Sequence, residues 1–397
     1  MLCNVERARE TMERAGVEAI VATTYENVSY LSGFDNPLPF YAGTRAAAVL
    51  PRRPDRSPSL VVSAVYIGYL ADRPTWMPSI RWFGSLGVRR NAEAVLGPPE
   101  SLTEQSLSAA RARSDADLAT ALRSALSEAG LVGSRVGIDD IRVGAAQPSG
   151  TAHWVDAAGL FLEIRAVKTA EEVERIARAT AINDDAIRAA ASAARAGGRW
   201  ASVTRAWRTA WAQGDGTAGF WGSGAGRYAA QLFDPYADYE LQAGDTIRFE
   251  GGGWYRGYWA DGGRAAVIGH PTERQRRLAE AQRAGAEEVE RRLGPGALPA
   301  DVINCVHARI IEAGMAEFPV ANVWGHGIGL TANELPSVRA AATTPLELGN
   351  VLCFETPYFE LGWGAMQMED TYVISDNGCA RLTTADRELI VVEEVET

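Results

Sequence analysis

The stretch that decides the fold is residues 247–264, IRFEGGGWYRGYWADGGR, in the C-terminal part of the chain. Its strand-like, Gly-punctuated pattern predicts two β-strands joined as a hairpin. Glu250 and Asp261 are eleven residues apart in this stretch. We expect the three glycines at 251–253 to provide the turn, so that both carboxylates lie on adjacent strands with the same facing.

Three later segments of the same character each carry one more potential metal ligand. They are VWGHGIGL at 323–330, VLCFETPYF at 351–359 and MQMEDTYVI at 366–374. His326 lies between two glycines, which lets an imidazole approach an ion closely. Glu355 and Glu369 each follow an apolar run, and a buried carboxylate must be paired, hydrogen-bonded or metal-bound. Together with Glu250 and Asp261 they form a set suited to a divalent ion and to hydrolysis by metal-bound water.

The N-terminal part of the chain alternates helical and short β patterns. A helix is expected at about 4–15, a strand at 17–22, a helix near 114–129 and a strand at 135–139. This alternation predicts a mixed α/β domain over residues 1–163.

A second domain is expected over residues 164–397. Thr169 followed by Glu172 predicts a capping box at the start of a long helix that ends before Gly197. The order of two helices followed by Gly-punctuated strands then occurs twice, with the later helices starting at Thr272 and near residue 300. If both groups of strands belong to one sheet, the five ligands meet at its centre.

Composition excludes several classes of protein. The chain has 397 residues, of which 47% are hydrophobic and 22% charged, so it can bury a sizeable core as a soluble globular protein. The net charge of −11 argues against nucleic acid or an anionic membrane as a partner and favours a small molecule or a peptide. Lys168 is the only lysine, and no phosphate-binding GxxxxGK[ST] loop is present.

Cysteine usage and the N-terminus favour a cytoplasmic protein. Four widely spaced cysteines form no CxxC pair, which is typical of reduced thiols rather than a disulfide framework. The first residues, MLCNVERARETMERAG, lack the apolar core of a signal peptide, and no apolar run reaches the length of a membrane span.

The ordered motifs resemble those of the prolidase, aminopeptidase P and creatinase family, whose members include M24-type metallopeptidases. The segments ENVSYLSGF and IRAVKTAEEVERIARA are similar to the N-terminal-domain and linker signatures of the same family. The resemblance implies an α+β protein with a C-terminal pita-bread domain preceded by a smaller mixed α/β domain, commonly as a homodimer. It implies one or two divalent ions, Mn, Fe, Co or Zn, and it assigns their ligands to Glu250, Asp261, His326, Glu355 and Glu369.

The chain departs from the family pattern at three places. Glu250 stands where the metallopeptidases have Asp, and its extra methylene moves the carboxylate by more than metal–ligand distances tolerate. Asn333 stands where the family usually has His, and Asn cannot shuttle protons near neutral pH. The segment 223–245 contains no histidine although the family pattern places one there. These departures point to a specialised relative rather than an ordinary proline-peptide hydrolase.

The expected reaction is hydrolysis of a C–N bond in a small non-standard amide or dipeptide-like substrate, aromatic or cationic in character. The resemblance assigns the catalytic work to Glu355 as general base, His326 and Glu369. Five residues around the motifs are expected to contact substrate: Asn333, Trp221, Trp259, Trp324 and Arg264. Three alternatives stay open: a metal-independent enzyme of the creatinase or ectoine hydrolase type, a lyase on the same fold, and a non-catalytic binding protein.

Overall fold

The structure is a computed structural model, and it describes residues 2–35, 46–231, 238–319 and 321–393. The chain divides into two compact units, Met1–Arg165 and Ala166–Thr397. The boundary expected from the sequence, between residues 163 and 164, falls two residues before this division. Within the described ranges no helix has both the length and the apolar character needed to cross a bilayer.

The first unit is built on a six-stranded mixed sheet. Its strand order is β4-β3-β2-β1-β5-β6. The strands are β1 (Ala19–Ala22), β2 (Ala46–Pro51), β3 (Ser59–Ser63), β4 (Ser79–Phe83), β5 (Arg135–Ile138) and β6 (His153–Asp156). The helices are α1 (Val5–Ala15), α2 (Tyr25–Ser32), α3 (Ile67–Asp72), α4 (Pro98–Arg113), α5 (Leu118–Glu128), α6 (Ile141–Ala145) and α7 (Ala158–Ala166), with a 3₁₀ turn at Ala64–Tyr66.

Local sequence explains most elements of this unit. The three central strands β1, β2 and β3 are buried along their whole length, as their continuous apolar runs predict. The helix expected near 114–129 is α5, which begins after Asp117 because that side chain accepts a hydrogen bond from the backbone N–H of Thr120. Helix α4 is an addition to the sequence prediction.

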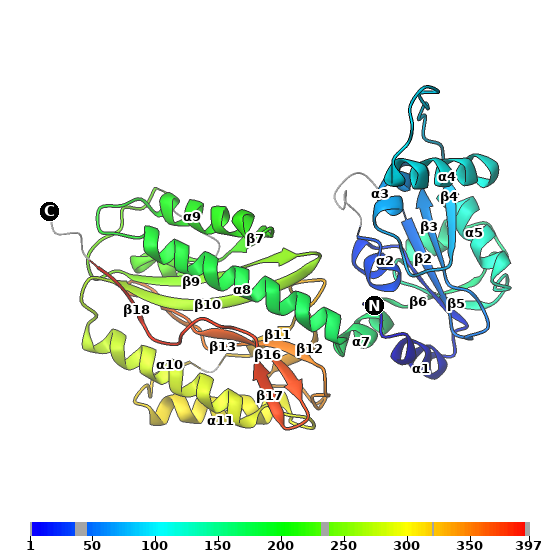
Figure 1. Ribbon diagram of the computed structural model, residues 1–397. Helices are drawn as coiled ribbons and strands as arrows, with labels where there is room; N and C mark the ends of the chain where they lie inside the picture. Colours follow the sequence, from blue (N-terminus) through cyan, green and yellow to red (C-terminus); the bar gives the residue numbers. More distant parts are fainter. Residues whose placement is uncertain (1, 36–45, 232–237, 320, 394–397) are drawn as a thin grey trace. The chain divides into compact units, whose positions relative to one another are not determined.

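Among the described residues, the second unit has four long helices and a ten-stranded sheet, whose arrangement is shown in Figure 1. The helices are α8 (Ala170–Ala193), α9 (Trp200–Gln213), α10 (Glu273–Arg292) and α11 (Pro299–Glu312). Capping boxes start α8 at Thr169 and α10 at Thr272, as the Thr-x-x-Glu and Thr-x-x-Gln patterns predict.

Ten strands in the described part of this unit form one sheet. The condition under which the five ligands can meet is therefore fulfilled. The main path runs β12-β11-β13-β16-β10-β9-β7, with β17, β18 and β8 paired at its sides. The strands are β7 (Thr217–Trp221), β8 (Gly224–Ala225), β9 (Thr246–Tyr255), β10 (Tyr258–Ile268), β11 (Val323–Gly327), β12 (Glu334–Arg339), β13 (Val351–Glu355), β16 (Glu369–Ser375), β17 (Gly378–Arg381) and β18 (Ile390–Val392). A short separate hairpin, β14 (Tyr358–Glu360) with β15 (Gly364–Met366), lies between β13 and β16 in sequence.

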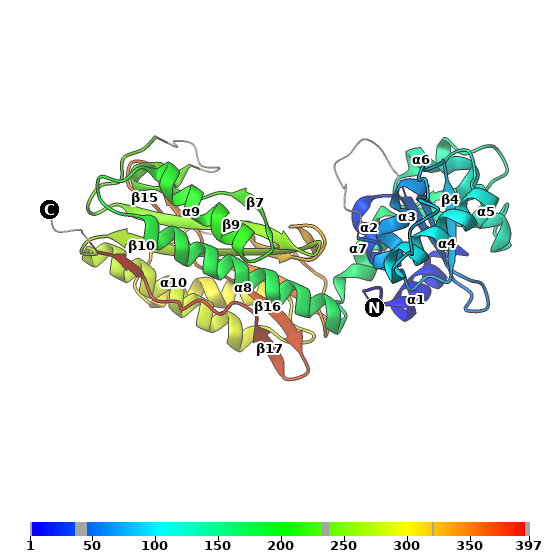
Figure 2. The same ribbon diagram turned by 45° about the horizontal axis from the view of Figure 1, so that its top comes forward.

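The sheet has a helix-covered face and an opposite face, which we call the site face. Ile247 and Phe249 of β9 pack in one apolar cluster with residues of α8 and α9. Leu352 and Phe354 of β13 pack in a second cluster with residues of α10 and α11. Figure 2 shows the same division, with α8 and α9 along β9 and β10. Because side chains alternate along a strand, the residues between these apolar positions lie on the site face.

The β9–β10 hairpin forms as predicted, but its turn is not at the glycine run. Tyr255 pairs with Tyr258, so the two-residue turn is Arg256-Gly257, where both residues have positive φ, 48° and 83°. The three glycines lie inside β9 instead. A Cβ at Gly252 would come within 2.1 Å of the carbonyl oxygen of Ala260, so glycine is needed there for close strand packing.

Candidate active site

Five strands, β9, β10, β11, β13 and β16, bring the five predicted ligands to one region of the site face. Glu250 pairs with Gly263, two residues beyond Asp261 on β10. Gly263 in turn pairs with Glu369 of β16, which pairs with Glu355 of β13. His326 of β11 lies opposite Cys353, two residues before Glu355. Strict two-residue alternation across these pairs gives all five side chains the same facing.

The five side chains fall into two groups that share Glu369. In the Asp261 group, Asp261, His326 and Glu369 offer ligand atoms that all lie within 4.8 Å of one another, and Glu250, Glu355 and Glu369 do the same in the Glu250 group. Carboxylate oxygens with one imidazole nitrogen form a donor set that suits Zn, Mn, Fe or Co. The residues present therefore fit a divalent ion.

Burial and mutual repulsion make the carboxylates costly to ionise together. Burial, followed by the charges of Asp261 and Glu355, raises the pKa of Glu250 well above its ordinary value. The pKa of Glu369 is raised in the same way by burial and by the charge of Asp261. Burial and the charge of Asp261 raise the pKa of Glu355 to about 7. A bound cation would favour the ionised form of each.

His326 is oriented by a backbone contact and a carboxylate. Its Nδ1 lies 3.1 Å from the carbonyl oxygen of Gly327, and its Nε2 lies 3.5 Å from Oδ2 of Asp261. Burial alone would lower the imidazole pKa, but the hydrogen bond and charge of Asp261 outweigh it and the pKa is raised. A carbonyl on Nδ1 fixes the tautomer in which Nε2 is the free ligand atom.

Two polar residues at this site were missed by the sequence analysis. Gln367 is buried, and its Nε2 donates to Glu250 and lies 3.2 Å from Oε2 of both Glu355 and Glu369. Arg248 is also buried, and its Nη1 donates to Oε1 of Gln367 over 3.0 Å. Both could have been found from the sequence. Arg248 precedes Glu250 by two residues and Gln367 precedes Glu369 by two, and residues two apart in an extended chain point to the same side.

Trp221 and Arg264 were expected to bind substrate, and the structure corrects both expectations. Trp221 pairs with Gly251 and Arg264 pairs with Phe249, so both side chains lie on the helix-covered face. The indole of Trp221 stacks on Trp200 and donates to Thr204. Arg264 forms a buried ion pair with Asp370 at 2.7 Å, and donates to several backbone carbonyls. Both residues hold the unit together.

Trp324 also has a packing role rather than the expected substrate contact. Simple alternation from His326 would place it on the site face, but the pairing of β11 and β12 shifts register between Val323 and Gly325. Gly325 takes φ 142° at this bulge. The indole is turned into the cluster with Phe318 and Phe354, and its N–H donates to the carbonyl of Ala321.

Two of the expected substrate residues have side chains that are at least partly exposed. Trp259 precedes Asp261 by two residues on β10, which gives it the same facing, and it is partly exposed beside Trp254. Asn333 is exposed in the loop that follows β11. Residues 232–237, part of the segment without histidine, lie outside the described residues.

A buried ion pair anchors the loop that carries Asn333. Nζ of Lys168 lies 3.0 Å from Oε2 of Glu334, and the two side chains are 0% and 1% exposed. The second oxygen of Glu334 accepts from the backbone N–H of Thr331. Glu172 lies in the same cluster and accepts from the hydroxyl of Tyr258. Burial raises the pKa of Glu172 to about 7, although the charge of Lys168 lowers it.

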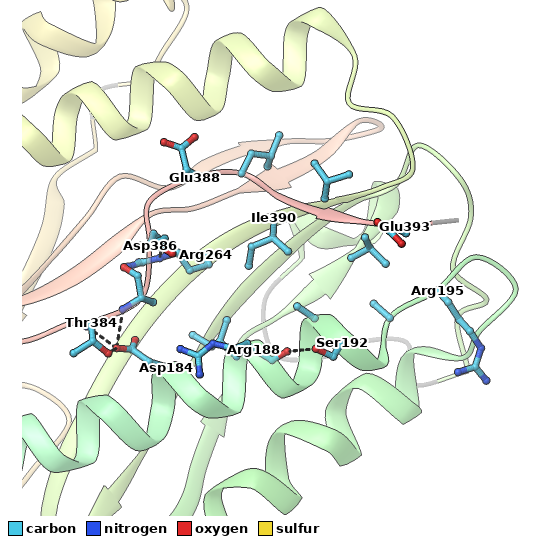
Figure 3. Close-up of a pocket in the computed structure, with 17 residues that line it drawn as sticks. Asp184, Arg188, Ser192, Arg195, Arg264, Thr384, Asp386, Glu388, Ile390 and Glu393 are labelled. Atoms are coloured by element: carbon cyan, nitrogen blue, oxygen red, sulfur yellow. Dashed lines mark hydrogen bonds between the residues drawn. The ribbon is translucent and has the colours of Figure 1, made fainter. Parts of the chain in front are cut away.

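A groove of about 780 Å³ lies on the other face of the sheet, between α8 and the segment 384–393 (Figure 3). Asp184 of α8 closes one end by accepting from the backbone N–H groups of Thr384 and Ala385. Arg264 lines this groove, whereas the five predicted ligands do not. The groove and the carboxylate cluster are therefore separate features of the second unit.

The fold and the donor set define a class: a two-unit α+β protein whose antiparallel sheet presents a carboxylate and imidazole cluster for divalent ions. Comparisons with known proteins agree. Residues 174–376 match metallopeptidase family M24, and residues 4–167 match the creatinase/prolidase N-terminal domain. The chain belongs to metallopeptidase family M24. This confirms the family that the motifs resemble, and with it the pita-bread α+β fold class.

Relatives in this family include named dipeptidases. The chain is 28% identical over 234 residues to a Xaa-Pro dipeptidase from Pyrococcus furiosus, covering 57% of this chain and 66% of the relative. It is 32% identical over 158 residues to a Xaa-Pro dipeptidase from Pyrococcus horikoshii, covering 39% and 44%. The matches thus span less than two thirds of these relatives. A Xaa-Pro dipeptidase structure from Bacillus anthracis aligns with a TM-score of 0.76 at 19% identity, over 98% of both chains, which shows the shared fold.

Proposed function

We propose that this protein is a metal-dependent hydrolase that cleaves a C–N bond in a small amide or dipeptide-like substrate. The observation that carries the proposal is the convergence of Glu250, Asp261, His326, Glu355 and Glu369 on one face of one sheet. Family M24 membership and relatives named Xaa-Pro dipeptidases support the same reaction class. The cytoplasmic location and the homodimer expected from the sequence are part of this proposal.

The chain's own residues have distinct parts in such a reaction. One or two divalent ions, Mn, Fe, Co or Zn, would supply a water of lowered pKa and polarise the scissile carbonyl. Glu355, at the C-terminal end of β13, would act as general base and accept the proton of the attacking water. His326 and Glu369 would hold the reacting groups in place, and Trp259 would form an apolar wall beside Asp261.

Asn333 restricts the range of substrates that we expect the protein to hydrolyse. Its amide can donate to a carbonyl or accept from an amine, but it cannot transfer a proton near neutral pH. Proton transfer to the leaving amine must then fall to the side chains already at the cluster. We therefore expect the chain to act better on substrates with a readily departing nitrogen group than on ordinary Xaa-Pro dipeptides.

The test is turnover of a panel of Xaa-Pro dipeptides and small N-acyl amides by full-length protein, before and after chelation and with Mn²⁺, Co²⁺ or Zn²⁺ restored. Glu355→Gln is expected to lower kcat by roughly 10²–10⁴-fold with little change in folding. Glu287→Gln on α10 is the matched control, because this half-buried carboxylate pairs with Arg283 on the helix-covered side. Turnover that survives chelation, or that Glu355→Gln leaves intact, would contradict the proposal.

A further inference from the structure

The side-chain amide of Gln367 lies between the three carboxylates of the Glu250 group. The side-chain nitrogen of Gln367 donates to Glu250 and lies 3.2 Å from Glu355 and from Glu369. These are the three carboxylates that would have to surround a second ion. We propose that the Gln367 amide fills this position as a neutral donor, so that the protein holds a single divalent ion in the Asp261 group. This inference rests on the proposed metal-dependent function and specifies its ion count.

Arg248 holds the amide in this orientation. Its Nη1 donates to Oε1 of Gln367 over 3.0 Å, so the oxygen end of the amide faces the guanidinium and the NH₂ end faces the carboxylates. Arg248 is itself anchored, because it donates to the carbonyl oxygens of Gly222 and Ala229 and lies over the ring of Phe359. Swinging Gln367 out of the cluster would take its acceptor oxygen away from a guanidinium that is 1% exposed.

The charge of Arg248 also disfavours a second ion. Arg248 lies on the same face of β9 as Glu250, two residues before it. A fixed guanidinium beside this group neutralises part of the negative charge that would otherwise attract a dication, and it repels a dication at short range. The Arg248–Gln367 pair thus gives the three carboxylates both a hydrogen-bond donor and a nearby positive charge.

The space around the amide is filled. A Cβ at Gly263 would lie 3.0 Å from Cγ of Gln367 and 3.0 Å from Oε2 of Glu250. The Gln367 side chain therefore packs directly over the backbone of β10, where only glycine leaves room for it.

The Gln367 amide contacts the Asp261 group at the shared Glu369, and Oδ1 of Asp261 accepts from the backbone N–H of Gly262, so Oδ2 of Asp261 and Nε2 of His326 are the ligand atoms that face each other. His326 has Nδ1 against the carbonyl of Gly327, which leaves Nε2 directed toward Oδ2 of Asp261 at 3.5 Å. The backbone carbonyl of Asp261 accepts from Thr371, which fixes the strand behind this carboxylate. An imidazole with two carboxylates is a common protein donor set for a single catalytic ion.

The first experiment measures metal content independently of activity. Full-length protein is equilibrated with Mn²⁺ or Co²⁺, freed of excess ion, and analysed for ions per chain by mass spectrometry. One ion per chain is expected. Two ions per chain would overturn the inference and leave the proposed hydrolase intact, whereas no bound ion would contradict the metal-dependent function itself.

Variants then locate the ion. Glu250→Gln is expected to retain one ion per chain, because Glu250 belongs only to the group filled by the amide, and Asp261→Asn is expected to lose it. The reverse pattern would overturn the assignment. Gln367→Ala opens the filled position and is expected to raise the content toward two ions, with a change in the Co²⁺ absorption spectrum. A Gln367→Ala protein that still binds one ion would refute the role given to the amide, and Glu287→Gln serves as the unaffected control.

Discussion

Replacing Lys168 by methionine tests how the loop after the imidazole motif is held. The change keeps most of the side-chain volume and removes the charge that lies 3.0 Å from Glu334. Both side chains of the pair are at most 1% exposed, so in the variant the carboxylate of Glu334 is left without its ion-pair partner and cannot be solvated by water instead. Glu172 also loses the positive charge that lowers its pKa.

The magnitude follows from this burial. Breaking a buried ion pair by removing one partner destabilises a protein by about 3–5 kcal/mol, whereas an exposed pair is worth at most about 1 kcal/mol. Arg188→Met provides the matched control, because Arg188 pairs with Asp185 on the same helix α8 with side chains 64% and 65% exposed. Lys168→Met should therefore cost several times more than Arg188→Met.

Urea unfolding followed by tryptophan fluorescence is the assay, because Trp200, Trp207 and Trp211 are buried in the second unit and report on its unfolding. The double variant Lys168→Met with Glu334→Gln should regain most of the loss, since the amide oxygen can still accept from Thr331. A loss below about 1 kcal/mol in Lys168→Met, or a double variant no more stable than the single one, would refute this account of the pair.

Three further predictions concern other features of the second unit. The pKa of Glu172 is raised from 4.5 to about 7, so the folded state retains a proton that the unfolded state releases, and the contribution of Glu172 to stability should fall by roughly 3 kcal/mol as pH rises from about 4.5 to about 7. Glu172→Gln should reduce the loss of stability between pH 5 and pH 8 in urea titrations, while the carboxylates of the candidate site still contribute to it; an unchanged pH dependence would contradict this prediction. Gly252→Ala should cost about 3 kcal/mol or more in chemical unfolding because its Cβ meets the backbone of Ala260, whereas Gly68→Ala, with open space around it, should be nearly neutral. Trp221→Ala should lower stability by about 3–5 kcal/mol without changing KM, while Trp259→Ala should raise KM with little loss of stability; equal effects on KM would show that the two faces are wrongly assigned.

Much of the fold is readable from local patterns. Thr169 with Glu172 and Thr272 with Gln275 mark the starts of two long helices because each pair satisfies backbone groups at a helix N-terminus. The β9–β10 hairpin follows from the strand pattern at 247–264. Its turn could not be placed, because a run of glycines is compatible both with a turn and with the close strand packing that these glycines provide.

Part of the candidate site could also be predicted from the sequence, and part could not. The five acidic and imidazole side chains could be named as candidates from their motifs. Glu355 and Glu369 follow apolar runs, His326 lies between two glycines, and Glu250 and Asp261 lie in a Gly-punctuated hairpin. The substrate residues were less predictable, since Trp221, Trp324 and Arg264 lie close to those motifs in sequence but face the helices. A shift of one position along a strand, or one bulge such as that at Gly325, reverses the face on which a side chain lies.

The sequence by itself determined the family, and it predicted two domains and five candidate ligands, because these depend on residue types at short spacings. Only the tertiary structure decided which strands are neighbours, and so placed Glu355 opposite Glu369 and Gln367 among three carboxylates. Arg248 and Gln367 are 119 residues apart. Their contact depends on long-range strand pairing, which local sequence patterns do not specify.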